Sequence, residues 1–103
     1  MHGEYKIPGG KLVVADLAVV DGRLARVQVS GDFFLEPPAA LDAIDAAIEG
    51  LRADAGEETL ASAVRGALPA GTRMFGITPE GVAVAVRRAL DAGVDGGEGG
   101  RAR

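Results

Sequence analysis

The chain has 103 residues and a formal net charge of −4 at pH 7. This length supports one domain with a single core. The acidic balance argues against nucleic acid as a partner, because it lacks the basic field that drives such binding. The sequence contains no cysteine, which excludes disulfides, thiolate metal sites and cysteine nucleophiles.

His2 is the only histidine and lies next to a terminus, where chains are usually poorly ordered. We therefore expect a frayed end there and no catalytic base or metal ligand.

The apolar run 12–20 contains Asp16 and is too short to cross a bilayer, and no basic segment precedes an apolar stretch as in a signal peptide. These features predict a cytoplasmic protein without a membrane partner.

Lys6 and Lys11 flank a Pro8-Gly9-Gly10 segment just before an apolar strand. This Lys6–Lys11 turn is not a P-loop, because the Gly-x-x-x-x-Gly-Lys-Ser/Thr spacing is absent and the turn precedes a strand. It can be a tight turn after a short strand at 5–7, in which Pro fixes φ and Gly permits the reversal. It can also bind an anion through close backbone N–H groups and the lysine charges. The residues alone favour the structural turn.

A β-hairpin is predicted for residues 12–30, because two Val- and Leu-rich runs are joined through Asp21-Gly22. A two-residue turn would set charged against apolar positions, with Asp16 opposite Val27. A three-residue loop at 20–22 gives one coherent apolar face, so we expect that register. Its cross-strand pairs are Val13 with Val29, Ala15 with Val27, Leu17 with Ala25, and Asp16 with Arg26.

Phe33 and Phe34 stand side by side just before the first predicted helix. Aromatic side chains carry large buried areas, so the pair is expected to anchor this helix to the sheet. The alternative is a contact surface for another protein. Adjacent residues of an extended segment point to opposite sides, so both rings reach one core only where the chain bends.

Three helices are predicted from apolar residues at helical spacing. The first runs over 38–50 and the second over 57–68, while the third opens with Thr78 as N-cap and Pro79 after it. Residues 72–77 form a short strand or an extended connection. The expected inner faces are Leu41, Ile44, Ile48 and Leu51; Leu60, Val64 and Leu68; and Val82, Ala85, Val86, Ala89 and Leu90.

A hairpin followed by helices predicts an α+β fold. We expect a small antiparallel sheet, made of the N-terminal hairpin and a short strand, covered on one face by about three helices. Arg87 and Arg88 are placed near the end of the third helix, where they suit the helix dipole. The domain is expected over residues 1–92, and the glycine-rich residues 93–103 are expected to form a disordered tail.

No set of residues for self-contained catalysis is evident. His2 alone supplies no Ser-His-Asp triad, and Ser30 and Ser62 have no recognisable nucleophile context. We therefore assign no catalytic, cofactor-binding or metal-binding residue to the chain. The carboxylates expected on exposed helix positions are Asp42, Asp45, Glu49, Glu57 and Glu58.

Three segments of the chain carry a resemblance to a known family. They are Tyr5-Lys6-Ile7-Pro8-Gly9-Gly10-Lys11-Leu12-Val13, Ser30-Gly31-Asp32-Phe33-Phe34-Leu35-Glu36-Pro37, and Gly76-Ile77-Thr78-Pro79-Glu80. They resemble the small C-terminal domain of bacterial lipoate–protein ligases, and the likeness spans residues 3–91. In that family a large catalytic domain binds lipoate and ATP, forms lipoyl-adenylate, and transfers the lipoyl group to a lysine of an acceptor domain.

The resemblance implies an accessory subunit of a two-component ligase, since the catalytic domain's Arg-Arg-x-Gly-Gly-Gly segment and adenylate-binding lysine are missing. It implies no ligase activity of the chain alone, with ATP, Mg²⁺ and lipoate bound through a separate catalytic subunit. Lipoyl acceptor domains are further expected partners. The chain is also expected to form homo-oligomers when its partner is absent.

Under this resemblance the Lys6–Lys11 turn closes over the partner's adenylation site, where Lys6 or Lys11 offsets negative charge on ATP or pyrophosphate. The alternative function is an interaction module unrelated to lipoylation. The residues expected to contact the partner are Pro8, Gly9, Gly10, Phe33 and Phe34.

Overall fold

The computed structural model describes residues 1–96 and confirms the α+β class. Strands β1, β2 and β3 form an antiparallel sheet in that order, and β4 and β5 form a two-stranded ribbon. None of the described helices is long and apolar enough to cross a membrane. In chain order the elements are β1 (His2–Lys6), β2 (Leu12–Val20), β3 (Arg23–Gly31), β4 (Phe34–Glu36), α1 (Ala40–Ile48), α2 (Glu57–Ala67), β5 (Arg73–Phe75) and α3 (Pro79–Gly96).

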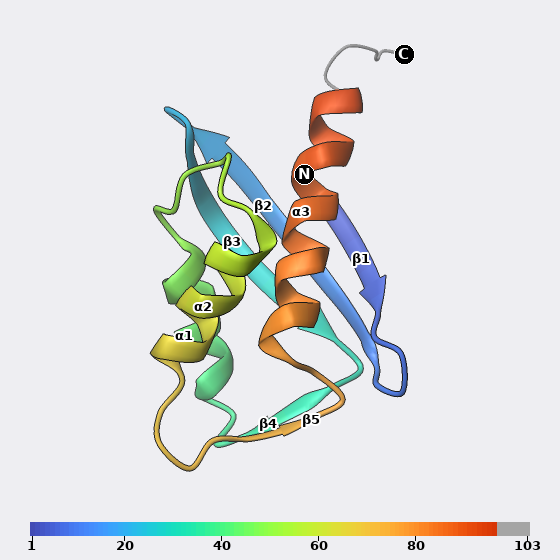
Figure 1. The fold of residues 1–103 in the computed structure, drawn as a ribbon, viewed down its shortest axis with the longest axis vertical. Coiled ribbons are helices and arrows are strands. Elements are labelled where there is room, and N and C mark those ends of the chain that lie inside the picture. The colour runs from blue at the N-terminus through green and yellow to red at the C-terminus, as the bar shows by residue number, and fades with distance from the viewer. Residues whose placement is uncertain (97–103) are drawn as a thin grey trace.

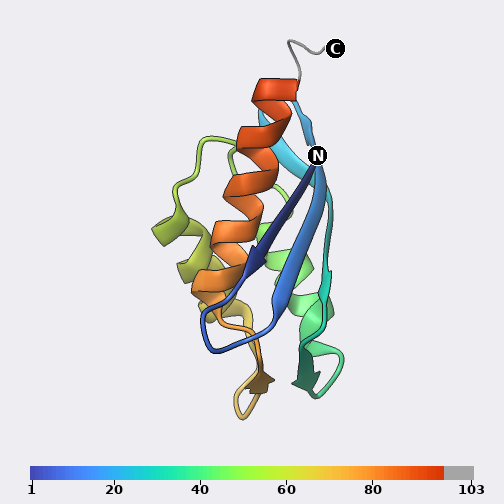
Figure 2. The same cartoon turned by 90° about the vertical axis from the view of Figure 1, so that its right-hand side faces the viewer.

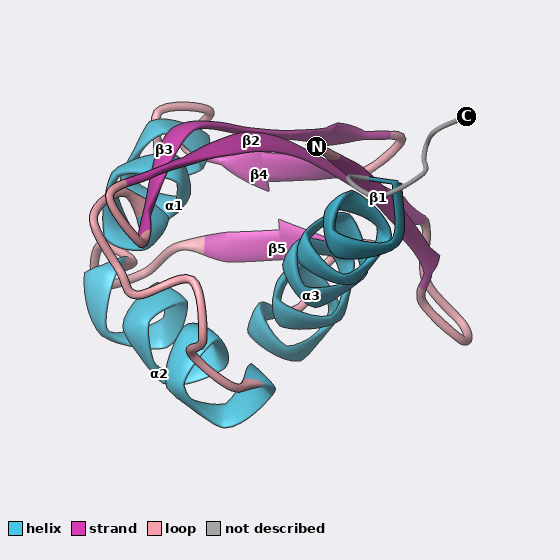
Figure 3. Ribbon diagram, turned by 90° about the horizontal axis from the view of Figure 1, so that it is seen from above, coloured by secondary structure: helices cyan, strands magenta, loops and turns pink. Residues whose placement is uncertain are grey.

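The three helices lie on one face of the β1–β2–β3 sheet and leave the other face open (Figure 3). α3 packs against β1 and β2, α1 packs against β3, and α2 packs against the other two helices. Figure 2 shows α3 running alongside β1 at the edge of the sheet. The core therefore lies between the sheet and the helices.

The helical spacing of apolar residues predicts most of the buried helix faces, but Leu41, Leu51 and Leu68 are only half-buried, and the last two lie beyond the ends of α1 and α2. Ile44 and Ile48 of α1 and Leu60 and Val64 of α2 are fully buried. Each such side chain contributes about 1.5–3 kcal/mol when it leaves water. The sheet adds the buried residues Val13, Ala15 and Leu17 from β2 and Leu24, Val27 and Val29 from β3, and α3 adds Val82, Ala85, Val86, Ala89 and Leu90.

The turn between β2 and β3 differs from the predicted three-residue loop. Asp21 and Gly22 both have positive φ, 52° and 75°, and Val20 pairs directly with Arg23. Two central residues with positive φ make the two-residue turn whose twist matches that of antiparallel strands. The predicted loop at 20–22 is therefore wrong.

A β-bulge in β3 removes the conflict that argued against the two-residue turn. Arg26, with φ 54°, and Val27 together oppose a single residue of β2. The extra residue returns Val27 to the face of Leu24, three positions earlier, so both are buried while Arg26 is exposed. As a consequence Asp16 pairs with Gln28, not with Arg26.

Two carboxylates, from Asp45 of α1 and from Glu49 just after its end, close the outer edge of β3. Val29 N–H donates to Asp45 Oδ1 at 3.0 Å, and Val27 N–H donates to Glu49 Oε2 at 2.6 Å. The sequence predicts plain exposed side chains here, but Asp45 is half-buried and burial raises the pKa of its carboxyl, against the effect of the Val29 hydrogen bond. Unpaired N–H groups of an edge strand attract other strands, so these acids protect the edge.

Helix α3 continues to Gly96, beyond the expected domain boundary at residue 92. Arg87 and Arg88 therefore lie in its middle, away from the end where the dipole would favour them. Arg87 instead donates to the Ala53 and Ala55 carbonyls at 2.9 and 3.2 Å. The remainder of the expected tail, 97–103, lies outside the described residues.

Candidate functional site

The three segments that carry the resemblance meet at one end of the molecule, the lower end in Figure 1. Lys11 N–H, just after the Lys6–Lys11 turn reverses, donates to the Gly76 carbonyl ahead of α3 at 2.9 Å. Phe34 of β4 pairs with Phe75 of β5 across the ribbon. We call the surface formed by 5–13, 30–37 and 73–80 the turn end.

The Lys6–Lys11 turn has the geometry of a type II turn. Gly10 N–H donates to the Ile7 carbonyl at 2.8 Å, and Gly9 has φ 75°. Pro8 precedes Gly9, as this turn type requires a fixed negative φ followed by a positive one. Ile7 N–H also donates to the Lys11 carbonyl at 3.2 Å. The tight turn that the sequence predicts for the Pro-Gly-Gly segment is therefore confirmed.

The two lysines of the turn are both exposed but are held differently. Lys6 Nζ donates to the Gly10 carbonyl at 2.8 Å and to the Ile7 carbonyl at 3.2 Å, so its ammonium closes the turn. The Lys11 side chain makes no hydrogen bond or ion pair within residues 1–96. The structure thus separates two residues that the sequence treats alike.

The two adjacent phenylalanines differ in how far they are exposed. Phe33 is half-buried and packs against the core, as an anchor does. Phe34 is 56% exposed, and its ring stacks on Phe75 with centroids 4.5 Å apart. Beside it lies an apolar groove of about 360 Å³, lined by Phe33, Phe34, Leu35, Glu36, Pro38 and Leu41.

The charges of the turn end are mixed. Arg73 lies 3.6 Å from Glu36 across the ribbon and 5.4 Å from the Phe75 ring centroid. Glu80, in the first turn of α3, forms an ion pair with Arg65 of α2, and this hydrogen bond lowers the pKa of the Glu80 carboxyl. These exposed pairs contribute little to stability, but they leave few unpaired charges around the two lysines.

The start of α3 forms as predicted. Thr78 Oγ1 accepts a hydrogen bond from Gly81 N–H at 3.0 Å, and Pro79 is the first helical residue. This N-cap satisfies one of the donors that the first helical turn leaves without a partner. The helix is thereby fixed directly behind Gly76, which holds the turn.

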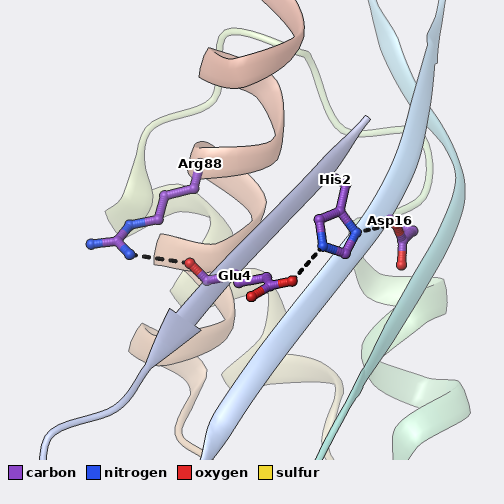
Figure 4. Close-up of polar contacts among 4 residues, drawn as sticks. All are labelled: His2, Glu4, Asp16 and Arg88. Atoms are coloured by element: carbon purple, nitrogen blue, oxygen red, sulfur yellow. Dashed lines mark hydrogen bonds and ion pairs between the residues drawn. The ribbon is translucent and has the colours of Figure 1, made fainter.

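His2 is the first residue of β1 and its backbone pairs with Asp16 of β2, so the expectation of a frayed end is wrong. Its Nδ1 and Nε2 lie 2.7 Å from Asp16 Oδ1 and Glu4 Oε2, on the open face of the sheet (Figure 4). Hydrogen bonds to Glu4 and then Asp16 raise the pKa of the imidazole. Arg88 donates to the Glu4 carbonyl at 3.1 Å and lies over the Tyr5 ring. Polar His2 and Glu4 alternate with Gly3 and Tyr5, and this period-two pattern is the sequence signal that would have extended the predicted strand at 5–7 back to His2.

A second hollow, of about 510 Å³, is lined by Arg23 at the start of β3 and by residues within 51–59, none of which belongs to the turn end. Its charged side chains are already occupied, because Arg52 makes a two-pronged pair with Asp54 at 2.8 and 2.9 Å and Arg23 donates to the Gly50 carbonyl. Within residues 1–96 no three His, Asp or Glu side chains are arranged to hold a metal ion.

Comparison with known proteins links the fold to a solved structure. No protein family and no curated protein matches the chain. Among solved structures, a chain from the archaeal lipoylation system of Thermoplasma acidophilum, a bipartite lipoate protein ligase and its E2 lipoyl domain, matches with a TM-score of 0.55 and 21% identity. The match covers 87% of this chain and 97% of that chain. At this identity the likeness establishes a shared fold.

Proposed function

We propose that the chain is the accessory subunit of a two-component lipoate–protein ligase, required with a separate catalytic subunit for ATP-dependent formation of lipoyl-AMP and hence for protein lipoylation. In this proposal the chain does not activate lipoate by itself. ATP, Mg²⁺ and lipoate bind to the catalytic subunit, and lipoyl acceptor domains are the proteins that the assembled enzyme modifies.

The likeness to the Thermoplasma chain carries the proposal. Because it covers nearly all of that chain, the neighbour is itself a small chain of similar length, which fits a ligase divided into two parts. The segments that resemble the ligase C-terminal domain give further support, since they share one surface and are not scattered over the molecule.

In the proposed enzyme the turn end adds shape and charge to the partner's active site. A rigid turn with two lysines provides positive charge beside a polyphosphate, and charge fixed in advance stabilises a transition state without reorganisation. Exposed apolar surface beside Phe34 provides area for docking. Closure of the turn over bound ATP also keeps water from the activated lipoate.

A mixing experiment tests this function. The catalytic subunit of the same organism is assayed for lipoate-dependent ATP–pyrophosphate exchange with increasing amounts of this chain. We expect exchange to rise and to saturate near one chain per catalytic subunit, and no exchange from the chain alone. A catalytic subunit that is equally active without the chain refutes the accessory role.

Mass spectrometry separates the accessory role from that of a lipoyl acceptor. The chain contains two lysines, Lys6 and Lys11, so lipoylation of either is read from its mass after a complete reaction. We expect an unmodified chain beside a lipoylated acceptor domain. Lipoylation of Lys6 or Lys11 makes the chain an acceptor instead.

A further inference from the structure

The two lysines of the turn have different amounts of hydrogen-bonding capacity left. Lys6 donates to two carbonyls of its own turn, those of Ile7 and Gly10. An ammonium has three N–H donors, so most of its capacity is used in closing the turn. Lys6 is therefore a structural residue of the loop.

Lys11 is held at its backbone and along its stem, while its ammonium has no partner within residues 1–96. Its N–H donates to the Gly76 carbonyl at 2.9 Å, and its carbonyl accepts from Ile7 N–H at 3.2 Å. The stem lies directly on Gly76, where an added Cβ would be 3.0 Å from Lys11 Cβ and would overlap Cγ. Holding the stem in place reduces the rotamer entropy lost when the ammonium binds.

Almost every other cationic side chain in the described part of the chain is occupied. The engaged arginines bond to carboxylates or carbonyls. Two cationic side chains of the described residues have no such bond, Lys11 and Arg26, and Arg26 lies at the β3 bulge, away from the turn. The engaged arginines are Arg23, Arg52, Arg65, Arg73, Arg87 and Arg88. Lys11 is thus the one uncommitted cation at the turn end.

We propose that Lys11, and not Lys6, is the cation that the turn presents to a phosphate group of a ligand bound in the catalytic subunit. This inference rests on the proposed function. A lysine ammonium is a compact charge suited to phosphate oxygens, and a charge-assisted hydrogen bond changes affinity about tenfold or more. Lys6 sets the shape of the turn, and Lys11 supplies its charge.

The test measures ATP–pyrophosphate exchange by the catalytic subunit saturated with variants of this chain. Lys11→Gln is expected to raise the KM for ATP or for pyrophosphate about tenfold, and Lys11→Arg to retain most of the affinity. Arg26→Gln is the matched control, because it removes the same charge far from the turn, and it is expected to leave both constants unchanged. Lys6→Gln is expected to lower the melting temperature.

Each outcome decides the assignment. The assignment is overturned if Lys11→Gln, like Arg26→Gln, leaves the KM values for ATP and pyrophosphate unchanged. If the wild-type chain still stimulates exchange in that case, the accessory function is retained. A larger rise in KM for Lys6→Gln than for Lys11→Gln reverses the assignment. Weaker binding of Lys11→Gln to the catalytic subunit, measured by calorimetry without ATP, makes Lys11 a docking contact. No stimulation by the wild-type chain removes both proposals.

Discussion

Replacing Gly76 by alanine moves the Lys11 stem without removing its charge. Gly76 has φ 82°, and its added Cβ would overlap Lys11 Cγ. The Lys11 backbone cannot retreat without losing its hydrogen bond to the Gly76 carbonyl. Gly71 offers a matched control, since its φ is 81° and a Cβ there meets nothing within 4 Å.

The two substitutions share one cost and differ in a second. An L-residue in the left-handed region costs about 1–2 kcal/mol, which both Gly71→Ala and Gly76→Ala incur. Overpacking against Lys11 adds about 1–3 kcal/mol for Gly76→Ala alone. We therefore expect a loss of about 1–2 kcal/mol for Gly71→Ala and about 2–5 kcal/mol for Gly76→Ala.

Urea denaturation of both variants measures these losses, with unchanged m-values as the sign that the folded state keeps its compactness. In a domain of this size, 1 kcal/mol corresponds to about 4–8 °C in melting temperature, so thermal melts separate the variants as well. At a temperature where both are folded, Gly76→Ala is expected to raise the same KM as Lys11→Gln. Equal stabilities for the two variants would refute the contact between Gly76 and the Lys11 stem.

Three further predictions concern docking, pH and the sheet edge. Phe34→Ser is expected to weaken binding to the catalytic subunit about tenfold, measured by calorimetry, whereas Val20→Ser, at an equally exposed position on the opposite end, is expected not to. The raised pKa of His2 means that the folded chain holds the proton more tightly, so its stabilisation is complete below the unfolded value of about 6.5 and is lost as pH rises through the higher folded pKa. The stability gap between wild type and His2→Gln should therefore close at alkaline pH, and a gap that widens there contradicts the two ion pairs. Asp45→Ala is expected to cost about 1 kcal/mol by leaving Val29 N–H without an acceptor, while Asp45→Asn, which keeps an acceptor and removes a partly buried charge, is expected to be nearly neutral; equal losses in urea denaturation would argue against that hydrogen bond.

Local features of the sequence predicted the helices well. Apolar residues such as Ile44 and Ile48 recur at helical spacing, and Thr78 and Pro79 mark a helix start through contacts within one turn. These signals depend only on neighbours in the chain, so they do not require knowledge of the fold. The same holds for the type II turn at Gly9.

The hairpin register required information that is not local. Both candidate turns were compared as regular ladders, and neither regular ladder buries Leu24 together with Val27. The bulge at Arg26 brings Leu24 and Val27 onto the same buried face, with a positive φ at a non-glycine residue. This conformation strains the backbone, and the packing of the core offsets the strain. Carboxylate contacts of Asp45 with β3 escaped prediction for the same reason, because their partner is fixed by tertiary structure.

The difference between the two lysines comes only partly from tertiary contacts. Lys6 and Lys11 look equivalent beside the Pro-Gly-Gly segment. Lys6 bonds to carbonyls of its own turn, which are local partners, whereas the Lys11 stem lies against Gly76, far along the chain. The sequence therefore predicted the turn and its two lysines as candidate site residues. It did not predict that Lys6 bonds within the turn while the Lys11 ammonium has no partner there.

The chain order of the ribbon links docking to the presentation of charge. Phe75, whose ring stacks on the exposed Phe34, is followed directly by Gly76, whose carbonyl holds Lys11 N–H. A catalytic subunit that docks on the ribbon in the proposed complex therefore fixes the same backbone segment that positions the lysine. Because the backbone between the two contacts is continuous and Thr78 caps α3 just beyond it, little freedom is left for Lys11 to move once the ribbon is bound. In the proposed complex, docking of the ribbon therefore also positions Lys11 for the phosphate group that we propose it binds.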